Sequence, residues 1–222
     1  MARHRLHFTK TGRGVYLSHL DLMRTIQRVF PRAGVAIRHT EGFNPHAYIS
    51  VALPLSVGAE SGCELLDFEV IDDTPLERLP ALLTTKMPEG IVVLEAYEAE
   101  RKVKEIAWLR LTGVLEYDAL EDTADMAERL GAFFGQEVIS VTKLTKKKKE
   151  TQVDIAPLIQ ELAFGPDGPH RVRVEAVIAA QNPGLNPNLL LNALEQTAPA
   201  LSPDFAQFAR VEIYDKEMAV FR

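Results

Sequence analysis

Residues 5–34 read RLHFTKTGRGVYLSHLDLMRTIQRVFPRAG, and this stretch decides the fold. Its first residues alternate Leu6 and Phe8 with polar neighbours, a pattern typical of a half-buried strand. A turn over Gly12-Arg13-Gly14 follows, and Ser18 stands three residues before Asp21, which is a variant of the capping box. The stretch therefore predicts a strand, a tight turn and a capped helix that runs toward residue 34.

The predicted helix is amphipathic. At about 100° per residue, one arc of the helix holds the apolar residues Leu22, Met23, Ile26, Val29, Phe30 and Ala33. The opposite arc holds Arg24, Arg28 and Arg32. Pro31 removes a backbone donor, so we expect the helix to kink or to end near Phe30.

The rest of the chain extends this unit into an α+β fold. After a turn cluster at 40–46, the pattern predicts strands at 48–53 and 64–70, a helix at 75–87 and a strand at 91–96. Strands are then expected at 108–117, 137–144, 170–179 and 205–214, with helices at 120–134 and 188–196. This order predicts two tandem ferredoxin-like (β-α-β-β-α-β) domains, 1–98 and 106–222. A lysine-rich insertion at 145–169 is expected to carry a short helix near Ile155 to Leu162.

Charge is distributed unevenly along the chain. The first 50 residues hold five of the six histidines and eight Lys or Arg against two acids, although the whole chain has a net charge of −6. Such a basic pole suggests an anionic partner. The single cysteine, Cys63, excludes a disulfide framework and a protein-held iron-sulfur cluster. Without a long apolar run or a signal sequence, we expect a cytoplasmic protein that does not span a membrane.

Three motifs are distinctive: YLSHLDLMR at 16–24, EGFNPH at 41–46 and LPLSVG at 53–58. They closely resemble the radical SAM-linked protein family, a domain of unknown function that is encoded beside or fused to a radical SAM protein. The similarity extends to the second half, at 146–159. The resemblance implies a radical SAM protein as partner. Because a radical SAM enzyme needs three cysteines for its cluster, this chain would be the accessory member, and we expect no cofactor on it.

Two basic features of the first domain are candidate ligand sites. The turn around Arg13 precedes a helix start, where free N–H groups favour an anion, but a plain connecting turn is the competing interpretation. The row of Arg24, Arg28 and Arg32 repels itself unless something negative lies across it, although a solvated helix face is the usual explanation.

The motifs contain further candidates for ligand binding. His19 and His46 could hold a ligand or transfer a proton, or they could serve only packing and turn geometry. Together with Asp21 they could in principle hold a metal, but the spacing specifies none, and we predict no metal site. The remaining candidates are Ser18, Arg38, Phe43, Asn44 and Glu64. Glu64 falls in a core-facing row and needs a partner, for which the Arg or His residues of the basic loop are the expected choice.

The second domain offers a basic run. Lys143, Lys146, Lys147, Lys148 and Lys149 could follow a phosphate backbone, or they could form only a solvated tip.

Three functions remain open. The chain could be a nonenzymatic module that binds RNA, such as tRNA or rRNA, or presents a substrate to a radical SAM enzyme. It could instead be a protein-protein adaptor that docks on that enzyme. A histidine-based enzyme that processes or modifies RNA is the third hypothesis, although no set of nucleophile, base and orienting group is recognisable.

Overall fold

The computed structural model describes residues 3–144 and 150–222, and it has a mixed α+β fold. The chain divides into two compact units. The N-terminal unit comprises the residues up to Glu105 together with Val220–Arg222, and the C-terminal unit comprises Ile106–Ala219. Within the described ranges, no helix combines the length and the apolar character that crossing a membrane requires.

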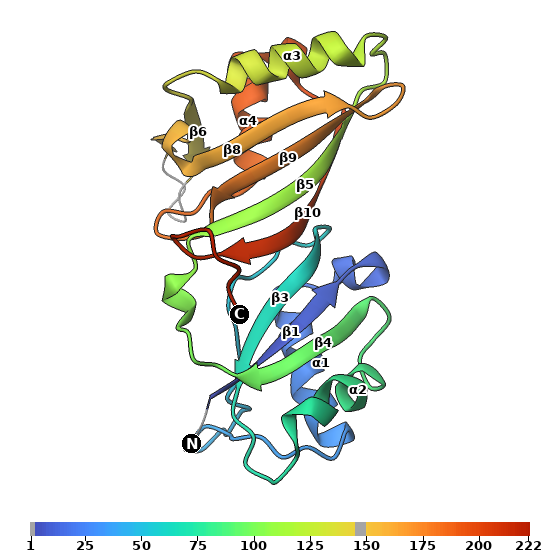
Figure 1. Cartoon of the computed structure of the whole chain (residues 1–222), viewed down its shortest axis with the longest axis vertical. Coiled ribbons are helices and arrows are strands. Elements are labelled where there is room, and N and C mark those ends of the chain that lie inside the picture. The colour runs from blue at the N-terminus through green and yellow to red at the C-terminus, as the bar shows by residue number, and fades with distance from the viewer. Residues whose placement is uncertain (1–2, 145–149) are drawn as a thin grey trace. The chain divides into compact units, whose positions relative to one another are not determined.

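The N-terminal unit has four strands: β1 (His4–Lys10), β2 (Ser50–Val51), β3 (Glu60–Phe68) and β4 (Ile91–Glu98). They pair antiparallel in the order β4-β1-β3-β2, and Figure 1 shows β4, β1 and β3 side by side. Its helical elements are the 3₁₀ turn η1 (Gly12–Tyr16), α1 (His19–Arg32), η2 (Leu76–Arg78), α2 (Leu79–Thr84) and η3 (Val103–Glu105). The apolar faces of α1 and α2 pack with one face of the sheet to form the core.

The sequence predicted α1 well. Leu22, Ile26, Val29 and Phe30 are buried against the sheet, as the apolar arc requires. The helix includes Pro31 and ends at Arg32, two residues beyond Phe30. Pro31 lacks a backbone N–H, so the last turn of the helix has one hydrogen bond fewer.

Four strands of the C-terminal unit pair antiparallel in the order β10-β5-β9-β8. Its strands are β5 (Trp108–Glu116), β8 (Ile159–Pro166), β9 (Arg171–Ala179) and β10 (Phe205–Tyr214). The helices α3 (Thr123–Phe134) and α4 (Asn188–Thr197) contribute side chains to one core with strands β5 and β9. The shorter elements are η4 (Ala156–Leu158), η5 (Pro199–Leu201) and a separate ribbon of β6 (Ser140–Leu144) and β7 (Glu150–Asp154).

Of the short helix expected near Ile155 to Leu162, only the 3₁₀ turn η4 at Ala156–Leu158 forms, and a strand begins at Ile159. The short turn η4 leads into strand β8, and the pairing of β8 with β9 shifts register between Ile159 and Glu161. Because of this bulge, Ile159 and Leu162 are both half-buried although they are three residues apart in the sequence. Apolar residues at that spacing are also typical of a helix. Consequently β8, and not the strand expected at 137–144, lies at the edge of the sheet beside β9.

Candidate functional site

The turn between β1 and α1 is built by backbone contacts. The N–H of Thr11 donates to the Gly90 carbonyl at 2.8 Å, the N–H of Gly14 donates to the Thr11 carbonyl at 2.9 Å, and the N–H of Gly12 donates to Glu60 Oε1 at 3.2 Å. A Cβ on Gly90 would lie 2.1 Å from the Thr11 oxygen, so the two segments touch through their backbones. A carboxylate thus already occupies part of the proposed anion seat, and these contacts favour the connecting-turn interpretation.

The polar residues at the start of α1 serve the helix itself. Ser18 Oγ accepts the N–H of Asp21 at 3.2 Å and donates to its carboxylate at 2.7 Å, while Arg24 lies 3.6 Å from the same carboxylate. His19 is half-buried. Arg13 is exposed and pairs with Glu89 at 3.3 Å. The sequence correctly identified this cap.

Glu64 is buried on β3, close to a second buried charge. The nearby opposite charge is Lys10, also buried, whose Nζ donates to the Val15 carbonyl at 2.9 Å. Burial lowers the pKa of Lys10, and the charge of Glu64 opposes that shift. Glu64 therefore helps to balance a buried cation beside η1.

The arginine row lies on the solvent face of α1. Arg24, Arg28 and Arg32 are all exposed. No carboxylate within residues 3–144 and 150–222 forms an ion pair with Arg28 or Arg32, so Asp21 balances only the first member of the row. Successive members are about 6 Å apart along the helix axis. The row is a continuous strip of positive charge.

The loop at 38–48, which contains EGFNPH, is closed by a set of hydrogen bonds. The N–H of Thr40 donates to the His46 carbonyl at 2.8 Å, and the N–H of His46 donates to Thr40 Oγ1 at 3.1 Å. Arg38 pairs with Glu69 at 3.0 Å and lies over the Tyr48 ring at 5.1 Å. That carboxylate raises the pKa of Arg38. Loop closure leaves Phe43 fully exposed at the tip.

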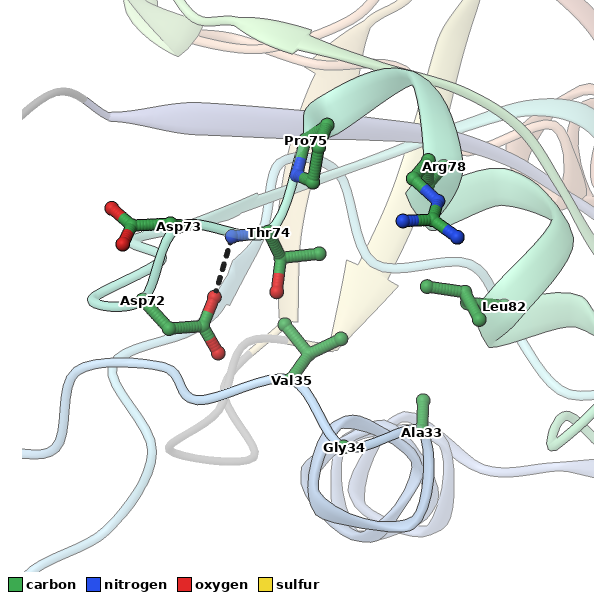
Figure 2. Close-up of a pocket in the computed structure, with 9 residues that line it drawn as sticks. All are labelled: Ala33, Gly34, Val35, Asp72, Asp73, Thr74, Pro75, Arg78 and Leu82. Atoms are coloured by element: carbon green, nitrogen blue, oxygen red, sulfur yellow. Dashed lines mark hydrogen bonds between the residues drawn. The ribbon is translucent and has the colours of Figure 1, made fainter.

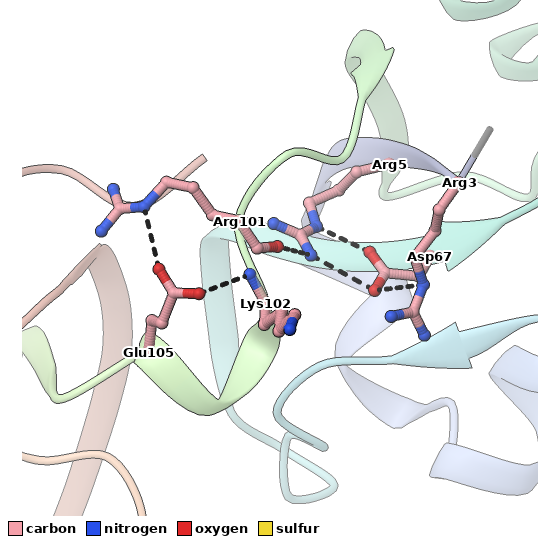
Figure 3. Close-up of polar contacts among 6 residues, drawn as sticks. All are labelled: Arg3, Arg5, Asp67, Arg101, Lys102 and Glu105. Carbon is pink, nitrogen blue, oxygen red and sulfur yellow. Dashed lines mark hydrogen bonds and ion pairs between the residues drawn. The ribbon is translucent and has the colours of Figure 1, made fainter.

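A cavity of about 290 Å³ lies beside this loop. It is lined by Arg3, Thr40, His46, Ala47, Tyr48, Ile49, Ser50 and Asp67. Asp67 is buried and accepts from Arg5 Nε at 2.6 Å, while Arg3 Nε lies 3.2 Å from its second oxygen (Figure 3). Arg5 also donates to the Arg101 carbonyl at 3.0 Å. The two guanidinium groups and the carboxylate together carry one net positive charge, and Arg3 is the one of the two arginines that lines the cavity.

A family profile matches residues 3–187, and its description is an uncharacterized protein conserved in bacteria, DUF2344. The chain belongs to the DUF2344 family. No protein among the curated ones matches.

Two solved structures are similar to this DUF2344 chain. The first is a chain in the crystal structure of a Cbf5-Nop10-Gar1 complex, with a TM-score of 0.52 and 6% sequence identity. The similarity covers 95% of the present chain and 48% of the other one. A putative glycine cleavage system transcriptional repressor is 12% identical, with 94% of this chain and 98% of that chain covered, and its TM-score of 0.25 supports no argument. The first likeness concerns the fold alone.

The YLSHLDLMR motif and the EGFNPH loop lie at opposite ends of the N-terminal unit. The YLSHLDLMR motif follows Lys10, which pairs with Ser61 and Ile91 at one end of the sheet. The EGFNPH loop follows the bridge between Ile37 and Val70 at the other end. Helix α1 spans about 20 Å between them. His19 and His46 therefore do not share a site, and the described residues contain no cluster of three metal-ligating side chains. This placement gives no support to a joint histidine-based reaction.

The structure also reveals a pocket that sequence analysis did not indicate. It has a volume of about 440 Å³ and is lined by Ala33, Gly34, Val35, Asp72, Asp73, Thr74, Pro75, Arg78 and Leu82 (Figure 2). Asp72 accepts the N–H groups of Ala36 at 2.6 Å and Thr74 at 3.0 Å. Hydrogen bonds from Thr74 and Ala36 lower the pKa of Asp72. This carboxylate holds the loop after β3 against the end of α1.

The predicted lysine run lies mostly outside the described residues. Lys143 is exposed on β6, whereas Lys146, Lys147, Lys148 and Lys149 lie outside the described residues. Sequence analysis missed Arg3, Arg5 and Asp67. An acid at position 67 of an apolar strand was the available signal, but only the pairing of Arg5 with Asp67 across β1 and β3 identifies its partner.

Proposed function

We propose that this DUF2344 protein is a cytoplasmic accessory module that binds RNA, or presents an RNA substrate, and works with a radical SAM enzyme. We further propose that both units are ferredoxin-like. The strand orders β4-β1-β3-β2 and β10-β5-β9-β8 support this assignment, because each matches a split β-α-β arrangement with a central pair of strands. Fold alone does not specify RNA binding, so the site must carry that argument.

The arginine row on α1 carries the RNA proposal. Three exposed guanidinium groups lie along one helix face, and only Arg24 has a carboxylate nearby among the described residues. Guanidinium groups bind phosphate oxygens with two hydrogen bonds at once, and a polyanion that crosses the row would relieve the repulsion within it. The positive wall of the cavity lies at the end of the unit where the row finishes, at Arg32. A backbone of linked phosphates fits such an extended arrangement better than a single small anion.

The proposed partnership with a radical SAM enzyme rests on the three motifs and on the cysteine count. Cys63 is the single cysteine and is buried in β3, so this chain offers no set of three thiolates for a cluster. In this proposal the partner performs the chemistry, and the present chain contributes affinity for the substrate.

Fluorescence anisotropy with labelled tRNA at 50–300 mM salt tests RNA binding. Neutralising the row in the double variant Arg28→Ala/Arg32→Ala should weaken binding and reduce the slope of log K against log salt by about 1.4, at about 0.7 per phosphate contact. The matched control is Arg129→Ala/Arg173→Ala, which removes two exposed, ion-paired arginines of the C-terminal unit. A flat salt response of the wild-type protein, or equal losses in both double variants, would contradict the proposal.

A protein-protein adaptor is the alternative, and exposed apolar side chains at the other end of the N-terminal unit favour it. Tyr16, Leu20 and Val57 are 76%, 64% and 59% exposed. Segment 57–58 lies against η1, because the N–H of Gly58 donates to the Val15 carbonyl at 2.9 Å. The adaptor hypothesis predicts that the radical SAM partner co-purifies after nuclease treatment and that Tyr16→Ser/Leu20→Ser abolishes this association. Loss of co-purification on nuclease treatment alone would instead indicate a complex bridged by RNA.

A further inference from the structure

We propose that the cavity beside the 38–48 loop binds one unpaired nucleotide of the RNA, so that the module selects single-stranded RNA over duplex. This inference rests on the proposed RNA binding and adds the form of RNA that the site accepts. The cavity lies wholly within the N-terminal unit, between the loop, β2 and the start of the chain.

The cavity combines a cation with polar groups that can contact a base. Ser50 lies directly opposite Asp67 in the pairing of β2 with β3, so a hydroxyl and a carboxylate stand side by side in the wall. The Arg3 side chain is 46% exposed and can contact a phosphate while it remains within reach of Asp67. A base edge offers hydrogen-bond partners to the Ser50 hydroxyl, and a phosphate offers Arg3 a second anionic partner beside Asp67.

Two rings belong to the cavity wall, and a third lies in the same loop. Tyr48 and His46 line the cavity, and Phe43 stands fully exposed at the loop tip. Arg38 lies over the Tyr48 ring at 5.1 Å, an arrangement that fixes the ring in the cavity wall. Proteins that bind single strands combine such stacking rings with a positively charged surface.

The loop is built to hold these rings in place before a ligand binds. Thr40 and His46 are joined by two hydrogen bonds that involve their backbones, and His46 Nδ1 lies 3.1 Å from Thr40 Oγ1. These contacts engage one ring nitrogen of His46 and leave Nε2 available for a ligand. Preorganisation lowers the entropic cost of binding, which otherwise opposes the capture of a flexible strand.

The arrangement discriminates against duplex RNA. In a duplex the base faces are stacked on their neighbours and the base edges are paired, so neither is available to a ring or a hydroxyl in a closed cavity. The arginine row contacts only phosphates and accepts both forms. The row therefore supplies general affinity and the cavity supplies the preference for an unpaired nucleotide.

Anisotropy of a labelled single-stranded oligoribonucleotide and of a blunt two-strand RNA duplex of equal length tests this division. Tyr48→Ala should weaken single-strand binding by about 5- to 150-fold, as expected for the loss of one stacked base, and should leave duplex binding unchanged. Phe43→Ala should act in the same direction. Tyr48→Phe keeps the ring and is the matched control, with affinity within about twofold of the wild type.

The outcomes separate the two proposals. If Arg28→Ala/Arg32→Ala weakens both RNAs while Tyr48→Ala weakens neither or both equally, RNA binding stands and the nucleotide site is refuted. If the wild-type protein binds neither RNA in a salt-dependent way, the proposed function fails and this inference fails with it. A free mononucleotide that competes with the oligoribonucleotide in the wild type, but not in Tyr48→Ala, would support the site directly. Thermal melting of each variant verifies that it is folded.

Discussion

Removing the charge of Asp67 should destabilise the N-terminal unit strongly. Asp67 is 3% exposed and its partner Arg5 is fully buried, so Asp67→Asn leaves a buried guanidinium without its counter-charge. The remaining contacts of Arg5 are the Arg101 carbonyl at 3.0 Å and the Phe221 ring at 5.0 Å, and neither carries a negative charge. Breaking one side of a buried ion pair costs about 3–5 kcal/mol.

The opposite substitution should cost less. In Arg5→Met the Asp67 carboxylate keeps Arg3 at 3.2 Å, so the loss should be only about 1.5–3 kcal/mol, the range for hydrogen bonds to charged groups. The double variant Arg5→Met/Asp67→Leu should be more stable than Asp67→Asn, because it leaves no buried charge in the pair. Glu105→Gln is the control from the same cluster: its carboxylate is 46% exposed, 3.8 Å from Arg101, and worth at most about 1 kcal/mol (Figure 3).

Urea unfolding can be followed in each unit separately, because the chain has one cysteine and one tryptophan. Cys63 is 1% exposed in β3, so its reaction with a thiol reagent reports opening of the N-terminal unit, and Trp108 fluorescence reports the C-terminal unit. With a slope near 1.5 kcal/mol per molar urea, a loss of 3 kcal/mol shifts the midpoint by about 2 M. A shift below about 0.5 M for Asp67→Asn, or a larger shift for Arg5→Met, would refute this reasoning.

Further predictions concern His7 and Gly90 of the N-terminal unit and Gly131 of the C-terminal unit. Burial, and then the charge of Arg222, lowers the pKa of His7 below its ordinary 6.5, so the unfolded chain takes up a proton that the folded chain resists. The N-terminal unit should therefore be most stable above pH 6.5 and should lose stability as the pH falls below that value. Urea unfolding followed by circular dichroism should show a smaller drop of the midpoint between pH 7.5 and 5.5 in His7→Gln than in the wild type. Gly90→Ala should lower the free energy of unfolding by about 3 kcal/mol, because φ is +89° and the new Cβ would meet the Thr11 oxygen. Gly131→Ala, at an open helical position, should raise it by about 0.5–1 kcal/mol. Urea midpoints measure both changes.

Local patterns in the sequence predicted the elements whose contacts are local. The cap at Ser18 and the apolar arc of α1 follow from side chains within a few residues of one another. Strand β8 was missed because a bulge between Ile159 and Glu161 breaks its alternation, and the position of a bulge depends on the partner strand. The α+β class could therefore be predicted, whereas the position of the last edge strand could not.

The candidate site was harder to predict, because the register of the paired strands decides which of its charged residues neutralise one another. Arg5 and Asp67 are 62 residues apart and meet only because β1 and β3 pair, and this contact removes Arg5 from the exposed basic pole. Lys10 is likewise buried, near Glu64. A count of eight basic residues in the first 50 overstates the positive charge that a partner meets. What remains accessible is chiefly the row on α1 and the wall of the cavity.

The distance between the YLSHLDLMR motif and the EGFNPH loop also allows the competing functions to be told apart. Tyr16 and Leu20 lie at the end of α1 where the helix begins, and Tyr48 lies at the end where it finishes, about 20 Å away. Substitutions this far apart, with no shared partner, should act independently. If Tyr16→Ser/Leu20→Ser abolishes association with a radical SAM partner while RNA binding persists, and Tyr48→Ala does the reverse, one small unit holds both an enzyme-docking end and an RNA-binding end. The adaptor and RNA-binding hypotheses would then describe two faces of the same accessory protein.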